Sequence, residues 1–169
     1  MELYIIRHAT AQPLGRKNDF TDEKRSLTAE GRERMRDAAR GLRKLGVELD
    51  LILTSPLARA VETAEVLANV FGMNKADVEQ TANLAPGASS GELFAEIKAH
   101  TGVESVALVG HQPDLGELIC KVARGNGGLS LELKKGSVCC VSIAQTVPEL
   151  QGALSWLMTP RQLRLLSKV

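Results

Sequence analysis

The sequence lacks the features that mark several classes of protein. Its formal net charge is only +1, which gives no electrostatic basis for binding nucleic acid or a membrane surface. No apolar run approaches the length of a membrane span, and the chain begins with a strand-like segment rather than a basic leader. The cysteines are odd in number and have no disulfide-framework spacing. These absences predict a cytoplasmic protein with reduced thiols.

Internal repeats, linkers and low-complexity segments are also absent from the sequence. A chain of 169 residues is expected to form one domain, here spanning 1–169, and it can bury a sizeable core without disulfide or metal staples. Hydrophobic residues make up 44% and charged residues 24%, both ordinary for a globular protein. We expect a monomer.

Short apolar runs alternate with amphipathic segments along most of the chain. The predicted strands are 3–6, 49–53, 78–81, 103–109, 129–133, 137–143 and 152–158. Helical patterns separate the first strands, whereas turns separate the last three, and 134–136 is predicted to be a hairpin loop. This order predicts an α/β fold with three layers, α/β/α. The sheet is expected to be mostly parallel with helices on both faces, and antiparallel near the C-terminus.

Polar residues follow three of the predicted strands. Arg7 and His8 end the first strand, Arg59 lies just after the second, and His111 follows the strand 103–109. Because ligands bind at the carboxyl ends of strands in open α/β sheets, these side chains are expected to meet at one edge. Arginine pairs with phosphate oxygens in a bidentate manner, so the group predicts a pocket for a phosphate dianion.

Histidine can itself act as a nucleophile toward phosphorus, provided that it is neutral. Neighbouring arginines favour the neutral form, because their charge disfavours the imidazolium. The second histidine can then donate a hydrogen bond to the phosphoryl oxygens. Cationic side chains of this kind can supply much of the catalysis of phosphoryl transfer.

A metal site is the competing interpretation of two histidines. No carboxylate or cysteine accompanies His8 or His111, and Arg7 and Arg59 would repel a cation. We therefore expect neither a metal nor another cofactor. His100, which has no motif around it, is expected to be a surface histidine.

Three segments carry a resemblance to a known family. Residues 3–9 (LYIIRHA), 55–64 (SPLARAVETA) and 110–113 (GHQP) resemble, in this order, the three motifs of the histidine phosphatase superfamily, which has the phosphoglycerate mutase-like fold. The short chain and the segment 25–28 (RSLT) are most similar to SixA-type phosphohistidine phosphatases.

This resemblance implies roles for five residues. His8 would be the phosphorylated nucleophile, and Arg7, Arg59 and His111 would form the phosphate pocket. Arg25 would be a further substrate contact.

The sequence departs from the family pattern at two places. Ala9 replaces the usual glycine, so the turn after His8 must accommodate a methyl group. Larger members carry an acidic proton donor in the region that corresponds to 83–86, where this chain has no carboxylate. Glu62 and Asp114 are the nearest acids in sequence, and both are expected to be structural.

The resemblance implies a metal-independent phosphatase for a phosphohistidine-bearing protein in signalling, such as a histidine phosphotransfer domain. A small-molecule phosphomonoesterase of the same superfamily is an alternative. Another is a non-catalytic phosphate-binding module, which would keep the pocket without forming a covalent intermediate. A mutase is disfavoured, because the chain lacks insertions that would enclose a sugar phosphate.

Overall fold

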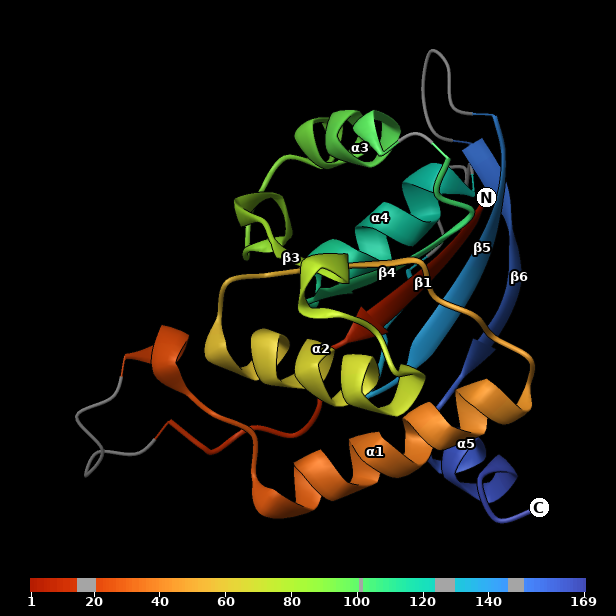
Figure 1. Ribbon diagram of the computed structural model, residues 1–169. Helices are drawn as coiled ribbons and strands as arrows, with labels where there is room; N and C mark the ends of the chain where they lie inside the picture. The colour runs from red at the N-terminus through yellow and green to blue at the C-terminus, as the bar shows by residue number, and fades with distance from the viewer. Residues whose placement is uncertain (15–20, 101, 124–129, 146–150) are drawn as a thin grey trace.

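A six-stranded sheet lies between two layers of helices in the computed structural model, which describes residues 1–14, 21–100, 102–123, 130–145 and 151–169 (Figure 1). The strands are β1 (Glu2–Arg7), β2 (Leu51–Thr54), β3 (Val78–Gln80), β4 (Ser105–Gly110), β5 (Val138–Gln145) and β6 (Gln151–Met158). Their order is β3-β2-β4-β1-β5-β6. The first four of these are parallel, and β5 and β6 are antiparallel additions. The predicted fold class is therefore confirmed.

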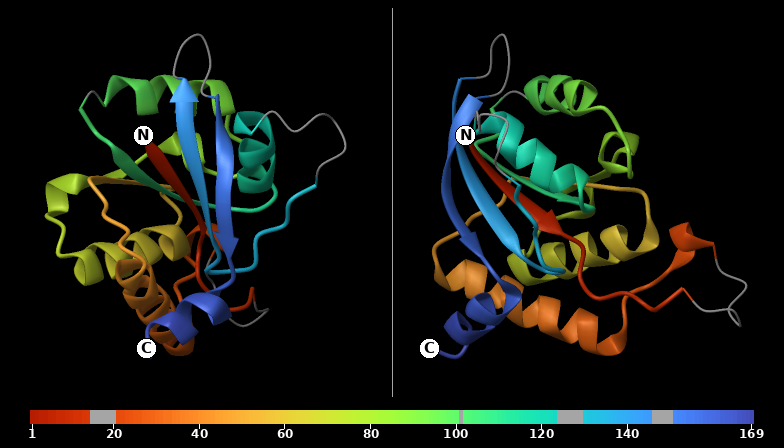
Figure 2. Two further views of the ribbon diagram at one scale, coloured as in Figure 1. Left: turned by 90° about the vertical axis from the view of Figure 1, so that its right-hand side faces the viewer. Right: turned by 180° about the vertical axis from the view of Figure 1, so that it is seen from behind.

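The helices cover both faces of the sheet. They are α1 (Ala29–Lys44), α2 (Ala58–Phe71), α3 (Ser90–Ala99), α4 (Asp114–Val122) and α5 (Pro160–Leu166). Figures 1 and 2 show α1, α2 and α5 gathered on one side and α3 and α4 on the other.

Alternate residues of β1 belong to different halves of the core. Leu3 and Ile5 pack under α3 and α4, whereas Tyr4 and Ile6 pack under α1 and α2. Both faces of this strand are covered, which explains its continuous apolar sequence.

Two glycines bring α1 close to its neighbours. A methyl group on Gly31 would collide with the carbonyl oxygen of Thr10, and one on Gly41 would collide with that of Leu163. The first turn of α1 is capped by Thr28, whose hydroxyl accepts the Gly31 N–H at 2.9 Å. The helix is thereby fixed against the segment after β1 at one end and against α5 farther along.

The strand predicted at 129–133 is wrong for residues 130–133, which have no strand structure, while residue 129 lies outside the described residues. Side chains from other segments donate hydrogen bonds to the carbonyl groups of this segment. Gln112 Nε2 donates to the carbonyl of Leu131 at 2.7 Å, and Arg7 Nη1 donates to that of Leu133 at 2.5 Å. Residues 134–136 are therefore not a hairpin loop but a turn that leads into β5.

The cysteines are not joined by disulfides. Cys139 and Cys140 are adjacent on β5 and contribute to opposite halves of the core, as strand alternation requires. Burial raises the pKa of each of these two thiols to about 12, so neither is a reactive thiolate. No helix in the described part of the chain is long and apolar enough to cross a membrane.

Candidate active site

The candidate site lies where three parallel strands end at one edge of the sheet. Arg7 and Gly110 are paired in the register of β1 and β4, so His8 and His111 follow at the same level. The His8 N–H donates to the Gly110 carbonyl at 3.1 Å, and the two imidazole centroids are 5.1 Å apart. Arg59 enters from the first turn of α2, directly after β2. The structure thus brings together the four predicted pocket residues.

His8 is 7% exposed, and its hydrogen bonds define its tautomer. Its Nδ1 lies 2.8 Å from the carbonyl oxygen of Ala9, which can only accept a hydrogen bond, so Nδ1 carries the proton. The other nitrogen, Nε2, accepts from Nε–H of Arg59 at 3.3 Å. The lone pair of Nε2 therefore faces the guanidinium that is expected to hold a phosphoryl group.

Both site histidines are held in the neutral form. The pKa of His8 is lowered to about 3, chiefly by burial; the neighbouring His111, Arg59 and Arg7 act in the same direction, and the Ala9 hydrogen bond opposes them. Burial also lowers the pKa of His111 to about 4, with help from Arg59 and Arg7. At neutral pH His8 is consequently an uncharged imidazole, as the predicted nucleophile must be.

His111 is oriented by Ser55. Its Nε2 lies 2.8 Å from Ser55 Oγ, which also accepts the Leu57 N–H at 3.3 Å. When the Ser55 hydroxyl donates its hydrogen to Nε2, the imidazole proton lies on Nδ1. In the part of the chain that the structure describes, this buried Nδ1 has no hydrogen-bond partner. In that tautomer Nδ1 is a donor that a bound phosphoryl oxygen can satisfy.

Arg7 is fixed by the segment that precedes β5. In addition to the Leu133 contact, its backbone N–H donates to Ser137 at 3.2 Å, and its carbonyl accepts from Gly136 at 3.0 Å. The buried Nε atom of Arg7 has no partner among the described residues. Arg7 therefore has a fixed position and, like His111, a buried side-chain nitrogen without a hydrogen-bond partner among the described residues.

Asp22 links the two remaining arginines, and sequence reasoning missed it. Arg59 donates through Nη1 to the Asp22 carbonyl at 2.8 Å and through Nη2 to its carboxylate at 3.0 Å. Arg25 donates to the same carboxylate through Nε at 2.8 Å and to the Gln12 carbonyl through Nη1 at 2.9 Å. Arg25 thus acts on Arg59 through Asp22, and no hydrogen bond to His8 is found for it in the described structure.

Asp22 is an anion in this arrangement. Burial opposes its ionisation, but the hydrogen bonds and charges of Arg25 and Arg59 outweigh that effect and lower its pKa. In the sequence, the only sign of these contacts is the spacing of three residues between Asp22 and Arg25.

Thr63 is a second residue that sequence reasoning missed. Its hydroxyl accepts the Ala9 N–H at 3.0 Å and donates to the Arg59 carbonyl at 2.6 Å. One side chain therefore joins the turn after His8 to the first turn of α2. Ala9 itself is buried in the core next to α1, so the fold accommodates its methyl group.

The acids considered from the sequence have structural partners. Glu62 accepts the Leu27 N–H at 2.7 Å and pairs with Arg32 at 2.8 Å. Asp114 accepts the Gly87 N–H at 3.2 Å.

Glu96 lies near the region where larger family members carry the proton donor. Its Oε2 accepts from the Thr81 hydroxyl at 2.7 Å and from the Asn83 amide at 2.8 Å. Within the described ranges, no three His, Cys, Asp or Glu side chains are grouped as metal ligands would be.

Comparisons with known proteins agree with this geometry. Residues 3–124 match the histidine phosphatase superfamily (branch 1). An uncharacterized protein of Picosynechococcus is 40% identical over 140 residues, which is 82% of each chain. Phosphohistidine phosphatase SixA of Escherichia coli is 26% identical over 167 residues, 98% of each chain. The solved structure of the protein histidine phosphatase SixA complexed with tungstate has a TM-score of 0.83 at 27% identity, and the match covers 96% of this chain and 99% of that one.

Proposed function

This chain belongs to the histidine phosphatase superfamily, and on that premise we propose that it is a metal-independent protein phosphohistidine phosphatase. Its substrate would be a phosphohistidine on a signalling protein in the cytoplasm, such as a histidine phosphotransfer domain. The observation that carries the proposal is the state of His8, a buried neutral imidazole whose Nε2 faces Arg59. Similarity to SixA along nearly the whole chain supports the same substrate class.

The first step is attack of His8 on phosphorus. The lone pair of Nε2 exchanges its hydrogen bond from Arg59 for the new P–N bond, while the bond from phosphorus to the substrate imidazole breaks. Arg59 and Arg7, with the Nδ1–H of His111, are placed to hold the charged phosphoryl oxygens. Nδ1 of His8 keeps its proton, and the Ala9 carbonyl stabilises the positive charge that develops on the ring.

The leaving group determines whether an acid is needed. Expulsion of an alkoxide from an alkyl phosphate requires a positioned proton donor, which contributes roughly 10²–10⁴-fold. The imidazole of a phosphohistidine can leave as a neutral molecule, because its other nitrogen can already carry a proton. Asp22, the carboxylate bound to Arg59, is held ionised and so has no proton to donate. This chemistry favours a phosphoramidate substrate over a phosphoserine.

The second step returns the enzyme to its starting state. Water attacks phospho-His8, the P–N bond breaks, and its electron pair returns to Nε2. Inorganic phosphate then leaves with the oxygen of that water. The cationic ring of phospho-His8 makes the neutral imidazole a good leaving group in this step too.

The test has two parts, trapping of the intermediate and comparison of substrates. Labelled phosphate should be trapped on the wild type in an acid-labile, base-stable form, and His8→Ala should abolish both labelling and turnover. The wild type should hydrolyse a phosphohistidine protein and p-nitrophenyl phosphate, and a phosphoserine peptide at least about a hundredfold more slowly.

Each alternative function predicts a different result. A non-catalytic module would bind phosphate without labelling or turnover. Labelling that persists in His8→Ala would refute the assigned nucleophile. Comparable rates on phosphoserine would show that a carboxylic acid reaches the leaving oxygen.

A further inference from the structure

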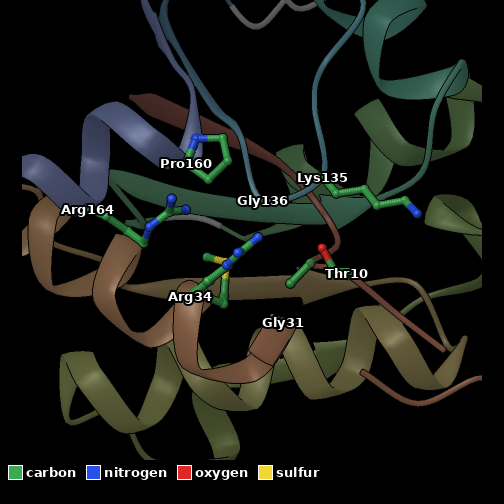
Figure 3. A pocket seen from close by; sticks show the side chains of 9 residues that line it. Thr10, Gly31, Arg34, Lys135, Gly136, Pro160 and Arg164 are labelled. Carbon is green, nitrogen blue, oxygen red and sulfur yellow. The ribbon is translucent and has the colours of Figure 1, made fainter. Parts of the chain in front are cut away.

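A second cationic pocket lies behind the turn that follows His8 (Figure 3). Its walls come from α1, from α5, and from the turn before β5. Figure 3 shows Arg34 and Arg164 reaching in from the two helices, while the Lys135 side chain extends from the turn away from these two arginines. Ala9 and Thr10 close the side toward the active site. The residues that line this pocket thus include three cations and no acid.

The cations of this pocket are only partly neutralised. Arg34 pairs with Glu30, one turn earlier on α1, and its side chain remains 54% exposed. For Lys135 and Arg164 the described structure contains no side-chain hydrogen bond or ion pair. The pocket therefore carries an excess of positive charge on a chain whose net charge is only +1.

The walls of the pocket are held by close contacts and hydrogen bonds to the segments that form the active site. The close contact of Gly31 with the Thr10 carbonyl fixes α1 against the turn after His8. The Gly136 N–H is bonded to the Arg7 carbonyl, so the turn that carries Lys135 is tied to the end of β1. Thr10 lies two residues after His8, which places their Cα atoms within about 7 Å of each other. A protein bound at His8 would therefore lie close to this pocket.

We propose that this pocket binds a carboxylate side chain of the phosphoprotein substrate and thereby docks an acidic surface beside the phosphohistidine. This inference rests on the proposed function and adds a substrate preference to it. Docking by charge would accelerate encounter and select among phosphohistidine proteins, which the small catalytic pocket alone cannot do.

The chemistry of the pocket favours a carboxylate over a second phosphate. Phosphate sites commonly use free backbone N–H groups, but the Gly31 N–H is bonded to Thr28 and the Gly136 N–H to Arg7. The N–H groups of the two lining glycines are therefore not available to an anion, whereas the cationic side chains and the Thr10 hydroxyl are. The hollow has a volume of about 50 Å³, and one water needs roughly 10–15 Å³. It has room for a carboxylate group, whereas a whole nucleotide would extend beyond it into solvent.

The experiment compares two phosphohistidine peptides of equal length. One has Asp and Glu two to four positions on either side of the phosphohistidine, and the other has Asn and Gln there. The enzymes are the wild type and the double variant Arg34→Gln/Arg164→Gln. The matched control, Arg36→Gln/Lys168→Gln, loses the same charge on exposed residues that do not line the pocket.

We expect the wild type and the control to prefer the acidic peptide by about fivefold in kcat/KM. The pocket variant should cleave the two peptides equally, with its rate on p-nitrophenyl phosphate within about twofold of wild type.

Four results would overturn the proposal. The pocket variant could keep the preference, or the wild type could show none. The variant could also lose activity on all three substrates alike, which would make the pocket a support for the His8 turn. Calorimetry with inorganic phosphate could detect a second site that the variant lacks, which would assign the pocket to a free anion. Cleavage of p-nitrophenyl phosphate but of neither peptide by the wild type would instead refute the proposed function, and the docking with it.

Discussion

Two buried neutral histidines should make the protein unusually sensitive to mild acid. An unfolded chain takes up protons on His8 and His111 as the pH falls through about 6.5, the ordinary pKa of histidine. The folded protein resists this uptake, because the pKa values are about 3 for His8 and about 4 for His111. The unfolded state therefore binds more protons than the native state between these values. It follows that stability rises with pH in this window and is lost as the pH falls.

The magnitude follows from the width of the window. From pH 7 to pH 5, each histidine of the unfolded chain takes up most of a proton while its folded counterpart stays neutral. At 1.36 kcal/mol per pKa unit, each histidine then lowers the free energy of unfolding by about 2 kcal/mol, and the pair by about 4 kcal/mol. Domains of this size are stable by only about 5–15 kcal/mol, so the loss is a large fraction of the total.

Urea unfolding at pH 7, 6 and 5 tests this for the wild type, His8→Asn and His111→Asn. The free energy of unfolding of the wild type falls between pH 7 and pH 5, and each substitution should make this fall smaller by about 2 kcal/mol, whatever its effect on stability at pH 7. Only the difference between pH values is compared, so cavities or lost hydrogen bonds do not affect the result. If His8→Asn lost as much stability as the wild type, the neutral buried state of His8 would be wrong.

Two further predictions concern Arg59. Arg59→Lys keeps the charge but loses the planar fork, so kcat/KM on p-nitrophenyl phosphate should fall about a hundredfold; an unchanged rate would show that Arg59 does not hold the phosphoryl group. Asp22→Ala removes the carboxylate that orients this guanidinium, and kcat/KM should fall about tenfold, with Asp22→Asn in between. A faster Asp22→Ala enzyme would mean instead that the carboxylate competes with the phosphoryl group for Arg59. Steady-state kinetics distinguishes these two roles of Asp22, and thermal melts of each variant serve as folding controls.

The four central site residues could be found from the sequence because a topological rule places them. Arg7, His8 and His111 directly follow predicted parallel strands, and Arg59 opens the helix after another. The carboxyl ends of parallel strands meet at one edge of the sheet. A site residue can therefore be predicted as soon as the strand before it is recognised in the sequence. Local apolar patterns reveal such strands, because burial on both faces demands continuous apolar residues.

Contacts that join distant segments through a single side chain were not predictable. Asp22 meets Arg59 across 37 residues, and Arg7 reaches the Leu133 carbonyl across 126. Neither contact is indicated in the sequence by a periodic pattern or a motif. Contacts of this kind also explain the wrong prediction of a strand at 129–133. The apolar pattern there suggested backbone pairing with a neighbouring strand. Instead, side chains donate hydrogen bonds to the carbonyl groups of described residues 131 and 133.

The sequence by itself determined the order of the elements, the sheet edge and the residue types that meet there, since these depend on local burial patterns and on chirality. Only the tertiary structure decided the proton position on His8, the neutrality of both imidazoles and the anionic state of Asp22. Those properties depend on which atoms face each nitrogen or oxygen and on how far water is excluded, and both quantities arise only when separate segments of the chain pack together.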